Sequence, residues 1–311
     1  MSPVAVTTLS GPGGEVHIGD EHPFAIIGER INPTGRSVLT EQMKAGDMTN
    51  VQADAIAQVR AGAAVLDLNA GIPGFDEPAM LSQVVKAVHE VVDVPLCIDS
   101  STPEALEAAV PLAQGKVLIN SVTAEAHSLE RLLPLVKKFG AAVIGMANDE
   151  EGISMDPQER LAAARKVVEA AADHGIARED VIIDPLTMPI GAAGDAATAM
   201  FETVRLIRDE LGVNVSCGAS NISFGMPDRQ GIDAAFLTMS AMAGMNTAIT
   251  NPLHAPVRSA LLASDLLLGR DAFGSAWIAD HRAKSGTGTP GAGGPGGSSS
   301  EAKPSDSPPE R

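Results

Sequence analysis

The chain has 311 residues, of which 44% are hydrophobic and 20% charged, as is typical of a soluble globular protein with a large core. Its net charge of -17 argues against nucleic acid, whose phosphates would be repelled, and only 3% of the residues are aromatic. No apolar segment is long enough to span a bilayer, and the N-terminus lacks the features of a signal peptide. We therefore expect a cytoplasmic protein that binds neither nucleic acid nor membranes.

The two cysteines, Cys97 and Cys217, lie in apolar segments far apart in the sequence. We expect buried free thiols in a reducing cytoplasm, in preference to a disulfide or a metal pair. A packed thiol is also favoured over a nucleophile at Cys217.

Short apolar segments alternate with longer amphipathic ones from Phe24 onward. Helix signals support this division, because Asp156 precedes a proline at one helix start and glycines such as Gly140 and Gly212 follow helix ends. The pattern predicts strands at 24–28, 64–69, 95–99, 116–121, 141–147, 181–185, 213–219 and 247–250. It predicts helices at 49–61, 77–92, 103–113, 127–139, 157–174, 196–211, 232–245 and 255–268.

The strands are apolar at nearly every position, as in "AAVIGMA", which is typical of parallel strands covered on both faces. Eight successive strand–helix units predict an α/β protein with a closed (β/α)8 TIM barrel, with an open doubly wound sheet as the alternative. The sequence has neither a GxGxxG after the first strand nor a GxxxxGK[ST] motif, so no dinucleotide or P-loop site is indicated.

The two ends of the chain differ in composition from its middle. Residues 1–22 are rich in Gly and Pro, and we expect an N-terminal extension that forms a short lid or a hairpin at the base of the barrel. The barrel domain is expected at 23–284. Residues 285–311 are a Gly/Pro/Ser-rich tail with almost nothing to bury, so we expect disorder and no function there.

Polar side chains stand at the carboxyl ends of several apolar strands. In a barrel, alternate residues point inward and the strand C-termini form the catalytic face. This parity places Asp or Asn on the inward face of four strands, with one more beyond the seventh strand: Asp67, Asn69, Asp99, Asn120, Asp184 and Asn221. Each alone could be a helix cap. Several at equivalent positions indicate one shared cavity with a polar ligand.

Carboxylates and amides without a lysine suit a flat, nitrogen-rich ring whose adjacent N–H groups a carboxylate can accept. A pterin or a guanine-like ring has such an edge. A metal is the competing ligand, but the histidines lie mostly on helices or loops and never at ligand spacing. We expect no metal, and an oxygen-only magnesium site remains the alternative.

At this point six segments match a family: "IIGERINPTGR", "AAVLDLNAG", "PLCIDSSTPEALEAAV", "VLINSVTAE", "DVIIDPL" and "GASNIS". Together they resemble the pterin-binding methyltetrahydrofolate:corrinoid protein methyltransferases, which are related to the folate domain of cobalamin-dependent methionine synthase and to dihydropteroate synthase. The resemblance covers about Phe24 to Arg270. It implies methyl transfer between N5 of 5-methyltetrahydrofolate and the cobalt of cobalamin on a partner corrinoid protein, with either direction open, and it implies a homodimer.

The same resemblance assigns roles to individual residues. Asp99, Asn120 and Asp184 would hold the pterin. Asn221 would reach the N5 region and is the one catalytic candidate. Supporting roles fall to four further residues: Glu29, Asp67, Asn69 and Arg229. None of the pterin residues is an obvious acid for N5, so the route of the proton stays open.

Two other functions are weighed against this one. Dihydropteroate synthase shares the general plan, but it needs a lysine after its seventh strand and an Asp-Ser-Phe signature after its first, where this chain has "GASNISFG" and "INPTGR". A non-catalytic folate- or corrinoid-docking module is the other alternative. The apolar helix at 232–245 could pack against a second subunit or within one core.

Overall fold

The structure, a computed structural model, describes residues 4–285. Eight parallel strands form one sheet in the order β10-β3-β4-β5-β6-β7-β8-β9. A bridge between Gly218 and Ile249 joins the segment after β9 to β10, so the sheet closes on itself. The strands are β3 (Ala25–Ile31), β4 (Val65–Asn69), β5 (Leu96–Asp99), β6 (Leu118–Thr123), β7 (Ala142–Met146), β8 (Val181–Asp184), β9 (Asn214–Val215) and β10 (Thr247–Thr250). The predicted (β/α)8 barrel is confirmed.

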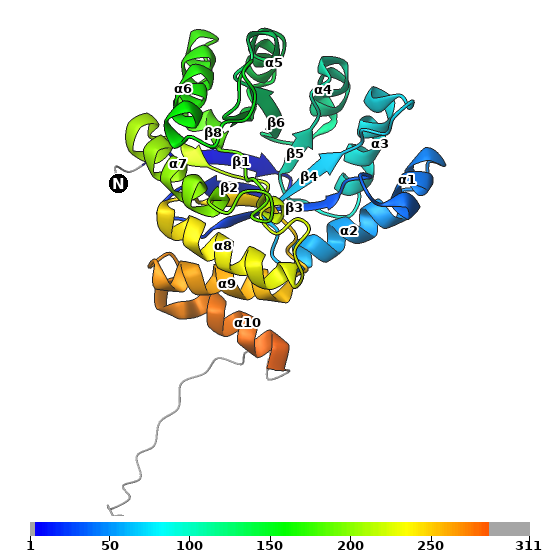
Figure 1. The fold of residues 1–311 in the computed structure, drawn as a ribbon. Helices are drawn as coiled ribbons and strands as arrows, with labels where there is room; N and C mark the ends of the chain where they lie inside the picture. Colours follow the sequence, from blue (N-terminus) through cyan, green and yellow to red (C-terminus); the bar gives the residue numbers. More distant parts are fainter. Residues whose placement is uncertain (1–3, 286–311) are drawn as a thin grey trace, which may run out of the picture.

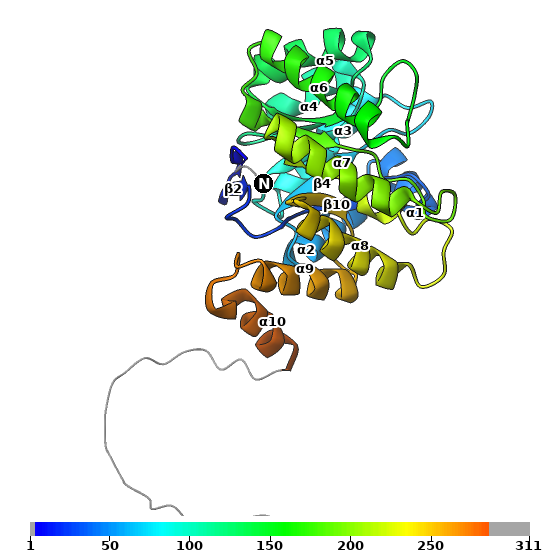
Figure 2. The ribbon, with the colours of Figure 1, turned by 60° about the vertical axis from the view of Figure 1, so that its left-hand side comes forward.

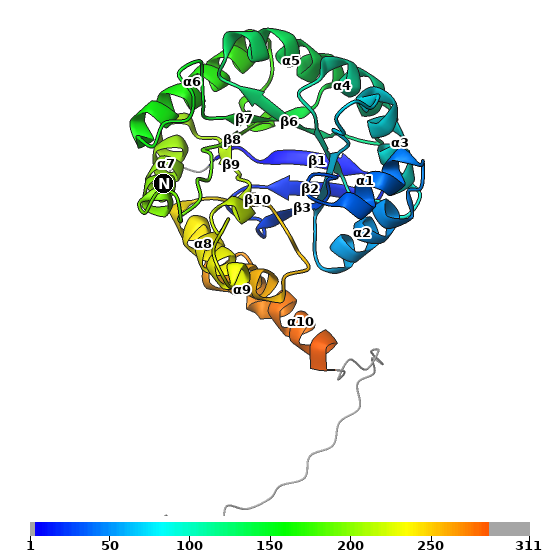
Figure 3. The same ribbon diagram turned by 45° about the vertical axis from the view of Figure 1, so that its right-hand side comes forward.

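Helices surround the ring of strands (Figure 3). Each predicted helix is present: α2 (Thr49–Arg60), α3 (Glu77–His89), α4 (Pro103–Ala109), α5 (Ala126–Phe139), α6 (Pro157–Asp173), α7 (Ala196–Leu211), α8 (Arg229–Ala243) and α9 (Ala255–Leu267). The expected end signals also hold. Asp156 accepts a hydrogen bond from Gln158 N at 2.7 Å, and Gly140 and Gly212 end α5 and α7 with positive φ.

Two helices of the described residues were not predicted. The strand predicted at 213–219 is shorter than expected, because β9 spans only Asn214–Val215. Within residues 4–285, α1 (Ser37–Lys44) and α10 (Ser275–Ser285) add to the eight helices of the barrel. Helix α10 extends away from the barrel beyond α9 (Figures 1 and 2). An ion pair between Asp280 of α10 and Arg258 of α9 (2.7 Å) links the two helices, and Lys284 pairs with Asp280 within α10 (2.6 Å). The buried residue of α10 is Asp280, so the helix has no buried apolar face that a periodic pattern could predict.

Strand residues alternate between two apolar layers. Leu66, Leu68 and Ile98 pack in the outer layer against the helices, whereas Cys97 and Leu118 pack in the layer inside the barrel. The predicted parity is therefore correct, and polar residues in phase with the inner layer project towards the barrel axis. Both cysteines are free and buried, as expected.

Strands β1 (Thr7–Gly11) and β2 (Gly14–Ile18) form an antiparallel hairpin across the middle of the ring (Figure 3). Leu9 and Ile18 are fully buried in the inner layer. Ser10 N donates to Lys116 O at 3.1 Å, just before β6, so the hairpin closes the amino-terminal end of the barrel. A Cβ at Gly115 would lie 2.3 Å from Ser10 O, so this close approach requires glycine.

The expected tail at 285–311 lies outside the described residues, apart from Ser285 at the end of α10. Within residues 4–285, the helices all fall short of the length and apolar character that crossing a membrane would need.

Candidate functional site

The carboxyl ends of β4, β5 and β6 bring four predicted residues into contact. The strand register pairs Asn69 with Asp99 and Asp99 with Asn120. Asn69 Nδ2 donates to Asp99 Oδ2 at 2.9 Å, and Asn120 Nδ2 donates to Asp67 Oδ1 at 3.2 Å. We call these four residues the acid–amide cluster. It lies where the barrel opens, opposite the hairpin.

The two acids of the acid–amide cluster are costly to ionise. Burial raises the pKa of Asp67, and the charge of Asp99 raises it further. Burial also raises the pKa of Asp99, against the hydrogen bond from Asn69, which lowers it. A ligand that donates hydrogen bonds here would offset this cost. Across residues 4–285, no three His, Cys, Asp or Glu side chains are grouped as ligands for a metal ion.

Asp184 ends β8, in register with Met146 of β7. β7 lies between β6 and β8, so Asp184 and the acid–amide cluster come from strands that are not adjacent. Its Oδ1 accepts a hydrogen bond from Leu186 N at 2.7 Å. Burial raises the pKa of Asp184 to about 6, opposed by hydrogen bonds from the Leu186 and Gly218 backbone and by the charge of Arg160.

Arg160 of α6 is a charged neighbour that the sequence analysis missed. It is fully buried, its Nε donates to Ser154 O at 2.6 Å, and its Nη1 has no partner among the described residues. Burial lowers the pKa of Arg160, whereas the charge of Asp184 raises it, so the two groups interact electrostatically. The sequence places Arg160 in the first turn of an amphipathic helix, and this pattern does not predict that its side chain interacts with a residue at the end of a strand.

Glu29 and Arg229 are both held by the short 3-10 turn η3 (Ala219–Asn221). Ser220 Oγ donates to both carboxylate oxygens of Glu29, at 2.9 and 3.0 Å. Arg229 Nη2 donates to Ser220 O at 2.6 Å, and its Nε donates to Ser223 Oγ at 3.0 Å. Burial raises the pKa of Glu29, and the Glu29 charge in turn raises that of Asp67. Glu29 thus links η3 to the acid–amide cluster.

Asn221 ends η3 and is exposed at the mouth of the barrel. A Cβ at Gly218 would lie 3.1 Å from Asn221 Nδ2, so the amide lies beside Gly218. The Gly218 backbone also lowers the pKa of Asp184. Asn221 and Asp184 therefore share one neighbour, and a ligand held by Asp184 lies within reach of η3.

A cavity of about 440 Å³ opens beside Glu29, and we call it the polar cavity. It is lined by Glu29, Arg30, Ser220, Asp228, Arg229, Gln230, Asp233, Asn251 and His254. The sequence analysis missed Asp233 and His254. The available signal was a lone acid within the apolar helix segment "GIDAAFLTM", which buries Asp233 among its core positions.

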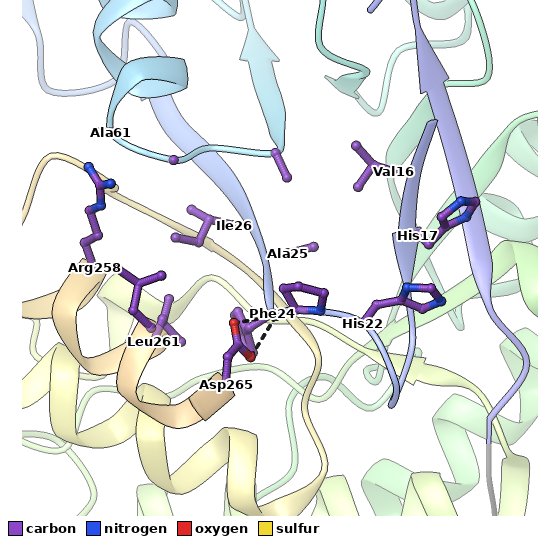
Figure 4. Close-up of a pocket in the computed structure, with 14 residues that line it drawn as sticks. Val16, His17, His22, Phe24, Ala25, Ile26, Ala61, Arg258, Leu261 and Asp265 are labelled. Carbon is purple, nitrogen blue, oxygen red and sulfur yellow. Dashed lines mark hydrogen bonds between the residues drawn. The ribbon is translucent and has the colours of Figure 1, made fainter. Parts of the chain in front are cut away.

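A second cavity, of about 400 Å³, lies at the opposite end of the barrel beside the hairpin (Figure 4). Its walls are mainly apolar, with Phe24 and Leu261 among the lining residues. The carboxylate of Asp265 there is already occupied, because both oxygens accept from Phe24 N at 3.0 Å. None of the predicted site residues lines this cavity. The candidate site is therefore at the carboxyl ends of the strands.

Known proteins resemble this chain over the whole barrel. A methylcorrinoid:tetrahydrofolate methyltransferase from Eubacterium limosum is 33% identical over 254 residues, which cover 79% of this chain and 92% of that protein. A methionine synthase from Mycobacterium tuberculosis is 29% identical over 248 residues, 74% of this chain but only 21% of that protein.

Solved structures agree on the fold. Dihydropteroate synthase from Xanthomonas albilineans, with 4-aminobenzoic acid, has a TM-score of 0.63 at 20% identity and covers 86% of this chain and 99% of that one. The enzyme from Thermus thermophilus, in complex with 6HMPPP, has a TM-score of 0.59 at 20% identity, with 84% and 99% covered. The family model described as pterin binding enzyme matches residues 28–251. The chain belongs to the family of pterin binding enzymes.

Proposed function

We propose that this protein is a methyltransferase that moves a methyl group between N5 of 5-methyltetrahydrofolate and the cobalt of cobalamin on a partner corrinoid protein. The observation that carries this proposal is the set of buried and half-buried acids and amides at neighbouring strand ends, in a chain 33% identical to a methylcorrinoid:tetrahydrofolate methyltransferase. That relative's name favours transfer from the methylated corrinoid protein to tetrahydrofolate.

In this proposal Asp99, Asn120 and Asp184 bind the pterin ring. The N–H groups along the ring edge are donors, and these acids are half-buried carboxylates whose pKa values burial raises, so a donor from the ligand would favour their ionised form. A hydrogen bond to a charged group contributes about 1.5–3 kcal/mol, which a bound pterin would supply. Asp67 and Asn69 support the ring-binding residues, because they hydrogen-bond Asn120 and Asp99.

The reaction needs no side-chain nucleophile. When tetrahydrofolate accepts the methyl group, N5 attacks the methyl carbon, and the carbon–cobalt bond breaks with its electron pair left on cobalt. The N5 proton must then leave. In the opposite direction N5 must gain a proton first, because an amide-like anion is a very poor leaving group. Asn221, exposed beside Gly218, would hydrogen-bond N5 and support its positive charge.

A corrinoid protein would dock at the mouth of the barrel, where Asn221 and Arg229 are exposed. We also propose a homodimer that uses the outer face of α8. One face of this helix is buried, with Phe236 and Leu237, and the other exposes Met239 and Met242. Both expected roles of the helix, core packing and subunit contact, are thus compatible with one element.

Two assays separate the proposed function from the alternatives. The protein is mixed with tetrahydrofolate and a methylated corrinoid protein, and methyltetrahydrofolate is quantified. In parallel it is mixed with a pterin diphosphate and 4-aminobenzoate, and dihydropteroate is quantified. We expect only the first product. Dihydropteroate alone would identify a synthase, and folate binding without either product would identify a docking module.

A further inference from the structure

The polar cavity contains an acid that the reaction described above does not use. Asp233 of α8 is 1% exposed, and its Oδ1 has no hydrogen-bond partner among the described residues. Its helix neighbours Phe236 and Leu237 are buried apolar residues. A buried carboxylate oxygen without a partner is costly, so its position at this cavity indicates a role with a proton or a ligand.

A histidine from a different element faces the same cavity. His254 precedes α9, and its Nε2 lies 3.0 Å from Asn251 Nδ2. Because the amide nitrogen is a donor, Nε2 is the acceptor, and a neutral ring carries its proton on Nδ1. That Nδ1 is buried and also has no partner within residues 4–285. Asp233 Oδ1, an acceptor, and His254 Nδ1, a donor, therefore both lack a partner at one cavity.

The polar cavity connects these groups to the proposed reaction centre. Glu29 lines it and accepts from Ser220, the residue that precedes Asn221. Glu29 also senses the charge of Asp233. The volume of about 440 Å³ leaves room for several waters between the side chains. The cavity thus offers a polar route to solvent that begins at Glu29 and Ser220, next to Asn221 in the chain.

We propose that Glu29, Asp233 and His254 form a proton-transfer path that exchanges the N5 proton with solvent during methyl transfer. This inference rests on the proposed function. When tetrahydrofolate is methylated, the proton leaves N5, passes by way of Glu29 and water to Asp233 and His254, and reaches solvent. The electron pair of the N5–H bond stays on nitrogen. In the opposite direction the same groups deliver the proton.

The surroundings move the pKa values of Asp233 and His254 towards each other. Burial raises the pKa of Asp233, and hydrogen bonding by Ser223 and the charges of Arg229 and His254 oppose this shift. Burial lowers the pKa of His254, while Asp233 raises it. The charged or titratable groups at the cavity, from β3, α8 and the segments before α8 and α9, are Glu29, Arg30, Asp228, Arg229, Asp233 and His254. Two groups whose pKa values are close to each other exchange a proton readily.

The test compares D233N and H254Q with the wild type and with D209N, which removes an exposed carboxylate of α7. Methyl transfer is followed between about pH 5.5 and 8.5, proton release is followed with a pH indicator, and tetrahydrofolate affinity is titrated separately. We expect D233N and H254Q to slow transfer and proton release by about 100-fold and to flatten the pH profile. Folate affinity should stay within about twofold, and D209N should match the wild type.

The possible failures point to different claims. If the wild type transfers methyl groups and both variants keep its rate and pH profile, the proton path is wrong and the proposed function stands. If the wild type transfers none, the proposed function fails and the path with it. Melting curves show whether D233N folds, and H254Q on the cavity wall tests the path independently.

Discussion

At the scale of single residues, the candidate site contains acids whose pKa values burial raises. The parity of the strands located Asp67, Asp99 and Asp184 from the sequence, because alternate positions of a parallel barrel strand face inward. Arg160 and Asp233 were missed, because they lie on helices. A helical period identifies an apolar face, but it does not identify a polar residue buried at one end of it.

Replacing Asp184 with alanine should weaken tetrahydrofolate binding by about 2–4 kcal/mol, because the pterin donors lose a charged acceptor. Isothermal titration measures this change. E159Q, which alters an exposed acid on α6, is the control and should bind like the wild type. Unchanged affinity in D184A would remove Asp184 from the site.

The pKa of Asp184, raised by burial to about 6, gives folate binding a pH dependence. Binding uses the ionised carboxylate, so affinity should fall as the pH drops below about 6, by up to about tenfold per unit. Titrations between about pH 5 and 8 measure this slope. D184N does not titrate, so its weaker affinity should vary less with pH, and an equal slope in both proteins would contradict the assignment.

Replacing Asn221 with alanine should slow methyl transfer more than it weakens folate binding, because the proposed hydrogen bond supports the charge that develops at N5. Single-turnover rates and equilibrium titrations give the two quantities. Equal losses in both would mean that Asn221 only binds the substrate.

At the scale of elements, the alternation of apolar and amphipathic segments predicted all eight strand–helix units. The segment 213–219 was read as one strand, but regular pairing ends at Val215 and resumes only at the bridge from Gly218. Its apolar character reflects burial on both sides of an irregular chain. The sequence could not distinguish the hairpin from a lid. Its two buried apolar residues, Leu9 and Ile18, contact side chains of the inner barrel layer that come from distant segments of the chain.

The hairpin should contribute strongly to stability. Replacing Leu9, which is fully buried, with alanine should lower the free energy of unfolding by about 2–5 kcal/mol, since it leaves a cavity under the barrel. Denaturant unfolding measures the loss. L267A removes the same atoms from a side chain that is 82% exposed and should change little. A small effect in L9A would show that the hairpin is dispensable for the core.

At the scale of the whole molecule, a proposed binding residue reduces the stability of the free protein. Burial raises the pKa of Asp184 from 3.8 to about 6. A raised pKa means that the folded state holds its proton longer than the unfolded state, so stability is full at low pH and falls as the pH rises through the folded pKa. The ligand that recovers this loss is the proposed pterin.

Relative to D184N, the wild type should lose about 3 kcal/mol of stability between about pH 4 and pH 8, from a shift of about two pKa units. Denaturant unfolding of both proteins across this range gives the difference. A difference that stays constant with pH would contradict the raised pKa.

The central claim is that this chain catalyses methyl transfer between a corrinoid protein and a folate bound at the strand ends. The most direct test is a single-turnover experiment that follows the absorbance of cobalt in a methylated corrinoid protein. We predict conversion to the cobalt(I) spectrum when both tetrahydrofolate and this protein are present, and much slower conversion with D184A. A spectrum that changes at the same rate without the protein, or not at all with it, would contradict the account.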